Sequence, residues 1–169
     1  TKAKNEVKVV FKNCKFSSVS WEKKDCPISA EFVDCTFRNF AGSHASFDHC
    51  SFGGWYSDGI VPFQNIQVNN CFFSDMTSVA STGRELHIDG TQIYGYADLD
   101  VENVGYNNCR FEIPPLQKEG STAGVNACLM LQMEYSNANG ITFQDCYVNG
   151  GGYTIYAWSK KEQFSLENI

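Results

Sequence analysis

Three short stretches of the sequence carry side chains that could bind a ligand or catalyse a reaction. In "RELHIDG", Glu85, His87 and Asp89 alternate with the apolar Leu86 and Ile88. Such alternation predicts one strand with the three polar side chains on its outer face. A histidine among carboxylates can act as a general base or help to hold a metal ion. The alternative is an ordinary solvated strand face.

The second stretch, "YADLDVE", supplies a pair of carboxylates. Asp98 and Asp100 alternate with Ala97, Leu99 and Val101, which predicts a strand with both carboxylates outward. Two such groups can provide acid and base for cleavage of a glycosidic bond, or they can bind calcium. Paired aspartates are also ordinary on an exposed strand, so these interpretations stay open. We expect no other cofactor.

The third stretch is aromatic. In "YTIYAW", we expect Tyr156 and Trp158 to face outward because the residues between them suit a core. With Trp55 and Tyr56 of "GGWYSD", they could form a stacking platform for sugar rings. The reverse register would bury Tyr156 and Trp158 as core residues.

Eight cysteines raise the same question of chemistry. Six of them occupy one position of a repeated eight-residue word, whereas Cys26 and Cys128 lie outside it. The alternatives are a disulfide framework, a metal site, a nucleophile or simple packing. No Cys-x-x-Cys pair is present, and two further copies of the word hold Thr91 and Ile169 in place of cysteine. We therefore expect the six cysteines to pack inside the fold.

The repeated word must position all of these residues. Its clear copies are "VVFKNCKF" (9–16), "AEFVDCTF" (30–37), "ASFDHCSF" (45–52), "IQVNNCFF" (66–73), "VGYNNCRF" (104–111) and "ITFQDCYV" (141–148). Two weaker copies are "LHIDGTQI" (86–93) and "FSLENI" (164–169). The first and third positions are apolar in every copy, which predicts a short strand with one face inward.

The fifth position of the word predicts a bend. It is filled by Asn13, Asp34, His49, Asn70, Gly90, Asn108, Asp145 and Asn168. These four residue types best tolerate a positive φ. The cysteine and the aromatic residue that follow should again face inward from a second strand, which leaves the bend at an angle.

Most copies follow one another at about 20 residues, the length of one coil of a solenoid. The step from Asn108 to Asp145 is longer, at 37 residues. We assign it to one coil with an inserted loop at residues 112–124, because this segment contains two prolines and two glycines.

The pattern resembles the right-handed parallel β-helix of the pectate-lyase-like (pectin lyase fold) superfamily, whose coils often read apolar-x-apolar-x-Asn-Cys-x-Phe. The resemblance implies an all-β solenoid of about eight coils, with an inward Cys/Phe ladder and an Asn/Asp bend ladder. It implies that the first strand of each coil lies in "DGIVPF", "YADLDV", "NACLMLQM" and "YTIYAW", and that its outer face is the substrate groove. The NTD, DD, GHG and RIK signatures of polygalacturonase-like enzymes are absent, and no pectate-lyase pattern is recognisable.

Composition excludes several partners. The net charge of -6 disfavours a nucleic-acid backbone, and no polybasic run suggests an anionic membrane. No apolar run approaches the roughly 20 residues that a membrane span requires. The chain is expected to be a single domain over residues 1–169 and a section of a longer protein with flanking domains, because "FSLENI" breaks off as a strand.

These observations favour a polysaccharide-recognising module of an extracellular bacterial protein or a phage tail spike, at the cell surface or the virion tail. The glycan would lie along the first-strand face, bound by Trp158, Tyr156, Asp98 and Asp100. A tail spike would imply a homotrimer. The alternatives are a polysaccharide lyase or glycoside hydrolase that uses the two aspartates, and a structural stalk without a ligand. Whether the chain is an enzyme stays open.

Overall fold

Parallel β-strands form all of the regular secondary structure in the described residues. The computed structural model describes residues 6–21, 27–53, 57–74, 87–96, 98–113 and 124–159. All sixteen regular elements within these ranges are strands, and neighbouring strands in both sheets run parallel. The fold is therefore all-β, as predicted, and is compatible with a parallel β-helix or a similar solenoid. Within the same ranges, no helix is long and apolar enough to cross a membrane.

The first half of each clear copy of the word forms a strand of a six-stranded sheet. Its strands are β1 (Val7–Lys12), β3 (Ile28–Val33), β5 (Ala45–Asp48), β8 (Gln64–Asn69), β11 (Val101–Asn107) and β14 (Ala138–Gln144), and they pair in that order. Equivalent positions of the word lie beside each other, as Phe32 does beside Phe47 and Val68 beside Tyr106. The repeat in the sequence is thus the repeat of the coil.

The second sheet contains two groups of strands. Those that follow a bend are β2 (Lys15–Ser20), β4 (Thr36–Gly42), β6 (Ser51–Phe52), β9 (Phe72–Ser74), β12 (Arg110–Ile113) and β15 (Tyr147–Gly150). The others are β7 (Ile60–Pro62), β10 (His87–Tyr94), β13 (Gly124–Met133) and β16 (Tyr153–Ser159). Strand β4 joins the groups, because its start pairs with β6 and its end with β7.

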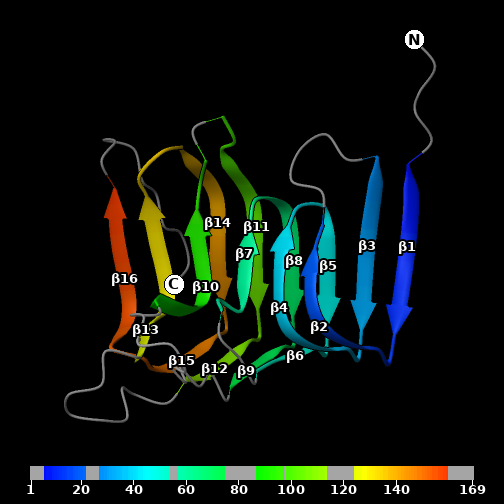
Figure 1. Cartoon of the computed structure of the whole chain (residues 1–169), viewed down its shortest axis with the longest axis horizontal. Coiled ribbons are helices and arrows are strands. Elements are labelled where there is room, and N and C mark those ends of the chain that lie inside the picture. Colours follow the sequence, from blue (N-terminus) through cyan, green and yellow to red (C-terminus); the bar gives the residue numbers. More distant parts are fainter. Residues whose placement is uncertain are drawn as a thin grey trace.

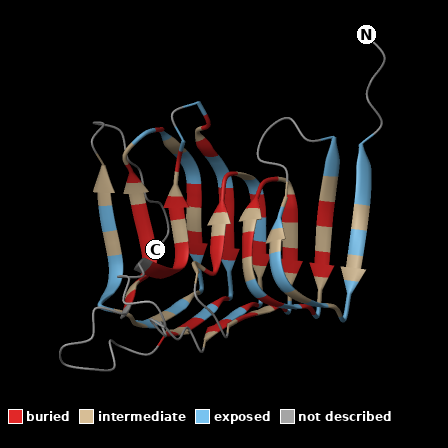
Figure 2. Ribbon diagram, in the orientation of Figure 1, coloured by how far each residue is buried: buried red, intermediate tan, exposed pale blue. Residues whose placement is uncertain are grey.

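The path of the chain through one coil is visible in Figure 1. Strands β7, β10, β13 and β16 run side by side at the front, β5, β8, β11 and β14 lie behind them, and the short β6, β9, β12 and β15 cross beneath. The two sheets enclose one core. Figure 2 shows that buried residues concentrate in the middle strands, whereas the end strands β1 and β16 are mostly exposed or half-buried.

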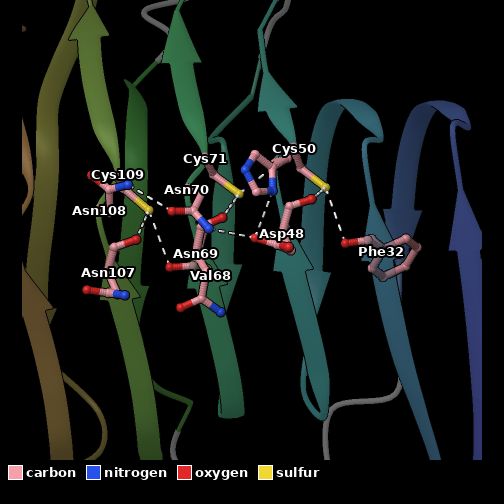
Figure 3. A network of polar contacts seen from close by, with 11 residues as sticks. Phe32, Asp48, Cys50, Val68, Asn69, Asn70, Cys71, Asn107, Asn108 and Cys109 are labelled. Carbon is pink, nitrogen blue, oxygen red and sulfur yellow. Dashed lines mark hydrogen bonds and ion pairs between the residues drawn. The ribbon is translucent and has the colours of Figure 1, made fainter.

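The predicted bends are confirmed in all six clear copies of the word. The residues there have φ between 51° and 54°: Asn13, Asp34, His49, Asn70, Asn108 and Asp145. Side chains at and beside the bends form a ladder on the surface, in which Asn108 Nδ2 donates to Asn70 Oδ1 and Asn70 Nδ2 donates to Oδ1 of Asp48, the residue before the bend at His49, both at 2.8 Å (Figure 3). The bond from Asn70 also holds the pKa of Asp48 below its usual value.

A second ladder of bends turns the chain into the six-stranded sheet. His44, Asn65 and Asn103 each have φ of 54°, and Gly140 has φ of 66°. Asn103 Nδ2 donates to Asn65 Oδ1 at 2.8 Å, and Asn65 Nδ2 lies 3.2 Å from His44 Nδ1. We did not predict this ladder. Its signal is in the sequence, since each of these residues directly precedes a copy of the word.

Stacked aromatic rings fill the core. One column runs from Phe11 through Phe32 to Phe47, with ring centroids 5.0 and 5.1 Å apart. A second column continues after the bends, with 5.0 Å between Phe37 and Phe52. Rings of successive coils stack because parallel pairing repeats each position at about 4.8 Å.

The cysteine ladder is buried and also hydrogen-bonded. The seven described cysteines are free, and Cys35, Cys50, Cys71, Cys109 and Cys128 are buried. The packing prediction is confirmed, with one addition: Cys71 Sγ lies 3.0 Å from the carbonyl oxygen of Asn69, and Cys109 Sγ contacts the carbonyls of Asn107 and Val68 (Figure 3). The thiols therefore donate to carbonyls next to the bend. Burial raises the pKa of Cys35, and that of Cys128 to about 12, so both thiols stay neutral at pH 7.

The prediction that "LHIDGTQI" is a copy of the word is wrong. Asn69 pairs directly with Asn107, so no coil lies between these copies, and Thr91 instead pairs with Ile60 of β7. Gly90 is not among the residues with a positive φ. Alternating apolar residues occur in any strand that has one face in the core, so "LHIDGTQI" matches the pattern of the word without being a copy of it. The described residues contain six copies rather than eight, and the copy at 164–169 lies outside them.

The long step between the last two clear copies of the word is a single coil. Tyr106 pairs with Phe143, so the 37-residue step from Asn108 to Asp145 is one coil. Glu112 and Ile113 extend β12 and Gly124 begins β13, so these ends of the predicted loop belong to strands. Residues 114–123 lie outside the described ranges. The predicted first strands in "DGIVPF", "NACLMLQM" and "YTIYAW" correspond to β7, β13 and β16.

The left-handed bend should dominate the effect of substitutions at Asn70. Asn70→Ala removes both ladder contacts and places a residue without a polar side chain at positive φ, which should lower the free energy of unfolding by about 2–3 kcal/mol. Asn70→Gly loses the same contacts without the steric penalty and should be less damaging by about 1 kcal/mol. Urea unfolding measures both. Equal losses would mean that backbone strain is not what selects this residue.

A buried polar pair gives a second prediction for the core. Thr91 Oγ1 lies 2.5 Å from the hydroxyl of Tyr106 and also donates to the carbonyl of Ile60 at 3.2 Å. Thr91→Val should lower the free energy of unfolding by about 2 kcal/mol, because the fully buried Tyr106 hydroxyl then lacks a partner. Tyr106→Phe should be milder, and adding it to Thr91→Val should restore part of the loss. A double variant less stable than Thr91→Val would contradict this account of the pair.

Candidate functional site

The outer face of β10, β13 and β16 carries two rows of side chains that cross the coils. In one row, Tyr94 pairs with Gln132 and Gln132 with Trp158; in the other, Gln92 pairs with Met130 and Met130 with Tyr156. Between these rows on β10 and β13, Ile93 and Leu131 are fully buried in the core. Because side chains alternate along a strand, both rows face away from the core, although Met130 is itself buried between its neighbours. We call these six residues the outer-face rows.

Tyr156 and Trp158 lie in the register expected from the sequence. Ile155 and Ala157 pair with Leu129 and Leu131, which are fully buried, although Ile155 and Ala157 are themselves exposed on this end strand. Tyr156 and Trp158 therefore point outward from β16, and both are half-buried. Their participation in binding stays a prediction. Trp55 and Tyr56, the other members of the predicted platform, lie outside the described residues.

The outer-face rows combine aromatic rings with polar groups at regular spacing. Tyr94 and Trp158 flank Gln132 and are two strand spacings apart, about 10 Å. Gln132 Nε2 donates to Glu134 Oε2 at 3.4 Å, which orients the amide beside the acid. Aromatic faces can stack on sugar rings, and amide and carboxylate groups can bind the hydroxyls of those rings. The sequence could not identify the row, because its members are 38 and 26 residues apart along the chain.

A tyrosine cluster extends the aromatic surface at the ends of β10 and β13. The Tyr94 ring lies 5.8 Å from Tyr96 and 5.6 Å from Tyr135, both edge to face, and Tyr96 contacts Phe63 at 5.4 Å. Tyr96 and Tyr135 are 40% and 46% exposed. Desolvation, with a contribution from Tyr135, raises the pKa of Tyr94, so its hydroxyl is neutral at pH 7. Sequence reasoning missed this cluster, whose signal was three tyrosines just after apolar strand runs.

The predicted strand "YADLDV" is wrong, and with it the expected placement of Asp98 and Asp100. Leu99 N–H donates to the carbonyl of Tyr96 at 3.1 Å, so this segment is a tight turn between β10 and β11. Leu99 is buried, which accounts for the apolar residue between the aspartates. Two residues on a turn do not share a face as they would on a strand.

Asp100 clamps the turn of the next coil. Its Oδ1 accepts the backbone N–H of Asn137 at 2.9 Å, and its Oδ2 accepts the side-chain amide of Asn137 at 3.3 Å. Asp98 is exposed on its own turn. Asp100 therefore has a structural partner on each oxygen.

The predicted group of Glu85, His87 and Asp89 is not assembled on a solvated face. Asp89 is fully buried rather than exposed, and its Oδ1 accepts the N–H of Ala127 at 2.8 Å. The backbone of His87 begins β10, but its side chain and all of Glu85 lie outside the described structure. No three His, Cys, Asp or Glu side chains gather into a group that could hold a metal ion in the part of the chain that is described.

Comparisons with known proteins add no assignment. No protein-family model, no curated protein and no solved structure matches this chain. The candidate site is therefore defined by the outer-face rows and the tyrosine cluster beside them.

The clamp at Asp100 predicts a loss of stability on truncation. Asp100→Ala should lower the free energy of unfolding by about 2 kcal/mol, because Asn137 loses an acceptor for its backbone N–H. Asp100→Asn keeps one carbonyl oxygen for that bond and should be milder by about half. Thermal and urea unfolding report both effects. A wild-type unfolding curve for Asp100→Ala would show that the turn does not depend on this contact.

Proposed function

We propose that the chain is a carbohydrate-recognising module, with a polysaccharide lying along the solenoid axis over β10, β13 and β16. The observation that carries the proposal is the row formed by Tyr94, Gln132 and Trp158. It sets two aromatic rings on either side of an amide, so neighbouring sugar rings of one chain could stack on the aromatics while the amide binds hydroxyls between them. The tyrosine cluster extends this surface sideways.

We further propose that the fold is a right-handed parallel β-helix related to the pectate-lyase-like superfamily. The proposal is supported by the order of strands within a coil, the two parallel sheets, and the bends at the asparagine position. The right-handedness is supported by the path of the chain in Figure 1. The chain runs up along the front strands and down along the back strands as the coils advance from β1 toward β16.

The electrostatics of the face fit a glycan better than other polymers. Among the described residues, Glu134 is a charged side chain in contact with the rows, through Gln132, and it is acidic. A nucleic-acid backbone would require basic groups, and the whole chain has a net charge of -6. Neutral sugar hydroxyls are well suited to carboxylate and amide acceptors.

The alternative of a lyase or hydrolase receives no specific support. It relies on Asp98 and Asp100 as a pair, and both oxygens of Asp100 accept hydrogen bonds from Asn137. We therefore propose binding without cleavage, and the test includes a product assay.

Binding to a glycan array, followed by calorimetry with the best oligosaccharide, tests the proposal. Trp158→Ala and Tyr94→Ala should each weaken binding by about tenfold, the loss expected for one stacked ring. Tyr147→Ala is the matched control, because Tyr147 is 47% exposed on β15, in the other group of strands, and stacks with Arg110. Its binding should equal that of the wild type.

Two results would contradict the proposal. One is the absence of binding by the wild type to any glycan on the array. The other is an equal loss of affinity in all three variants, which would point to a general effect on folding. If new reducing ends or unsaturated products appear, the protein is a hydrolase or lyase rather than a binding module.

A further inference from the structure

Asp89 lies where three coils meet, apart from the outer-face rows. Its backbone N–H donates to Asp58 Oδ1 at 2.9 Å, and its carbonyl accepts the N–H of Gly59 at 2.9 Å. Its own Oδ1 accepts the N–H of Ala127 at 2.8 Å. The register of β10 against β13 shifts at this point, since Ile88 pairs with Val125 but Asp89 with Ala127. Asp89 thus holds a β-bulge of β13 and the turn that leads into β7.

The other oxygen of Asp89 lacks a hydrogen-bond partner among the residues that the structure describes. Asp89 is fully buried, and its Oδ2 forms no hydrogen bond with any of them. Among the described residues, the titratable groups that interact with it from the packed elements are Asp58, from the turn before β7, and Cys128, from β13. Neither can supply a positive charge. An ionised carboxylate here would be a buried charge beside a second carboxylate, which is strongly unfavourable.

We propose that Asp58 and Asp89 form a proton-binding pair, in which a proton held on Asp89 Oδ2 secures the junction of β7, β10 and β13. The protonated carboxyl is neutral, so its burial costs much less than burial of the ionised form. Loss of the proton places two negative charges in the junction and weakens it.

The titration of Asp89 agrees with this geometry. Burial, reinforced by the charge of Asp58, raises the pKa of Asp89 from 3.8 to about 7, while the N–H of Ala127 and the amide of Asn126 act in the opposite direction. Because the folded protein binds this proton more tightly than the unfolded chain, the stabilisation is complete below about pH 4 and is lost as the pH rises through about 7. Each pH unit in this window should change the unfolding equilibrium constant about tenfold, or roughly a thousandfold in total.

Unfolding by urea between about pH 4 and about pH 8 tests the pair. Asp89→Asn keeps an oxygen for Ala127 and places an N–H donor where the proton would be. It should remove this pH dependence and be more stable than the wild type at the alkaline end. Asp34→Asn is the control, because it neutralises one exposed carboxylate at a bend where other coils already carry asparagine. It should keep the wild-type pH dependence.

A direct measurement covers the case in which Asp89→Asn does not fold. The carboxyl ¹³C resonance of Asp89 in the wild type should titrate near pH 7, and a midpoint close to 3.8 would overturn the proposal. Equal pH dependence in the wild type and Asp89→Asn would overturn it too. So would stabilisation of the wild type, but not of Asp89→Asn, by millimolar calcium chloride at the alkaline end, since the site would then hold a cation in place of a proton.

Discussion

The left-handed bend at the asparagine position is the constraint on which the rest of the structure depends. Few side chains tolerate a φ near 53°, so the position is restricted to Asn, Asp and His in the six described copies. A bend at the same place in every coil aligns the strands on either side of it, and this alignment brings phenylalanine onto phenylalanine and cysteine onto cysteine. The thiols then satisfy carbonyls beside the bend, and the surface amides link one coil to the next.

The regular side of the solenoid leaves the other side free to vary. The steps from Asn70 to Asn108 and from Asn108 to Asp145 are 38 and 37 residues, almost twice the 21 residues from Asn13 to Asp34. These long coils contribute β10, β13 and the turns at their ends. The outer-face rows, the tyrosine cluster and the buried Asp89 all belong to this side. Structural repetition and candidate function are therefore separated in space, with the bends supporting a surface that does not repeat.

The predictions from the sequence that proved wrong concern the variable side of the solenoid. The bends, the inward cysteines and phenylalanines and the single long coil were predicted correctly, because each depends on a local preference repeated many times. "LHIDGTQI" and "YADLDV" were misassigned because alternating apolar residues cannot tell one inward-facing strand from another, or a strand from a turn with a buried leucine. The second ladder of bends was within reach of the sequence, since His44, Asn65 and Asn103 each stand directly before a copy of the word.

The sequence by itself determined the coil: an all-β chain with parallel strands, a left-handed bend, and a core of stacked cysteines and aromatic rings. These features follow from side-chain alternation and backbone sterics, which act over a few residues. The tertiary structure alone decided which distant residues meet. Tyr94, Gln132 and Trp158 share a row, and Asp58, Asp89 and Ala127 share a junction, only because the lengths of the intervening loops and one bulge set the register between coils. The register between strands of successive coils depends on the number of residues in each loop, and no local sequence pattern specifies that number.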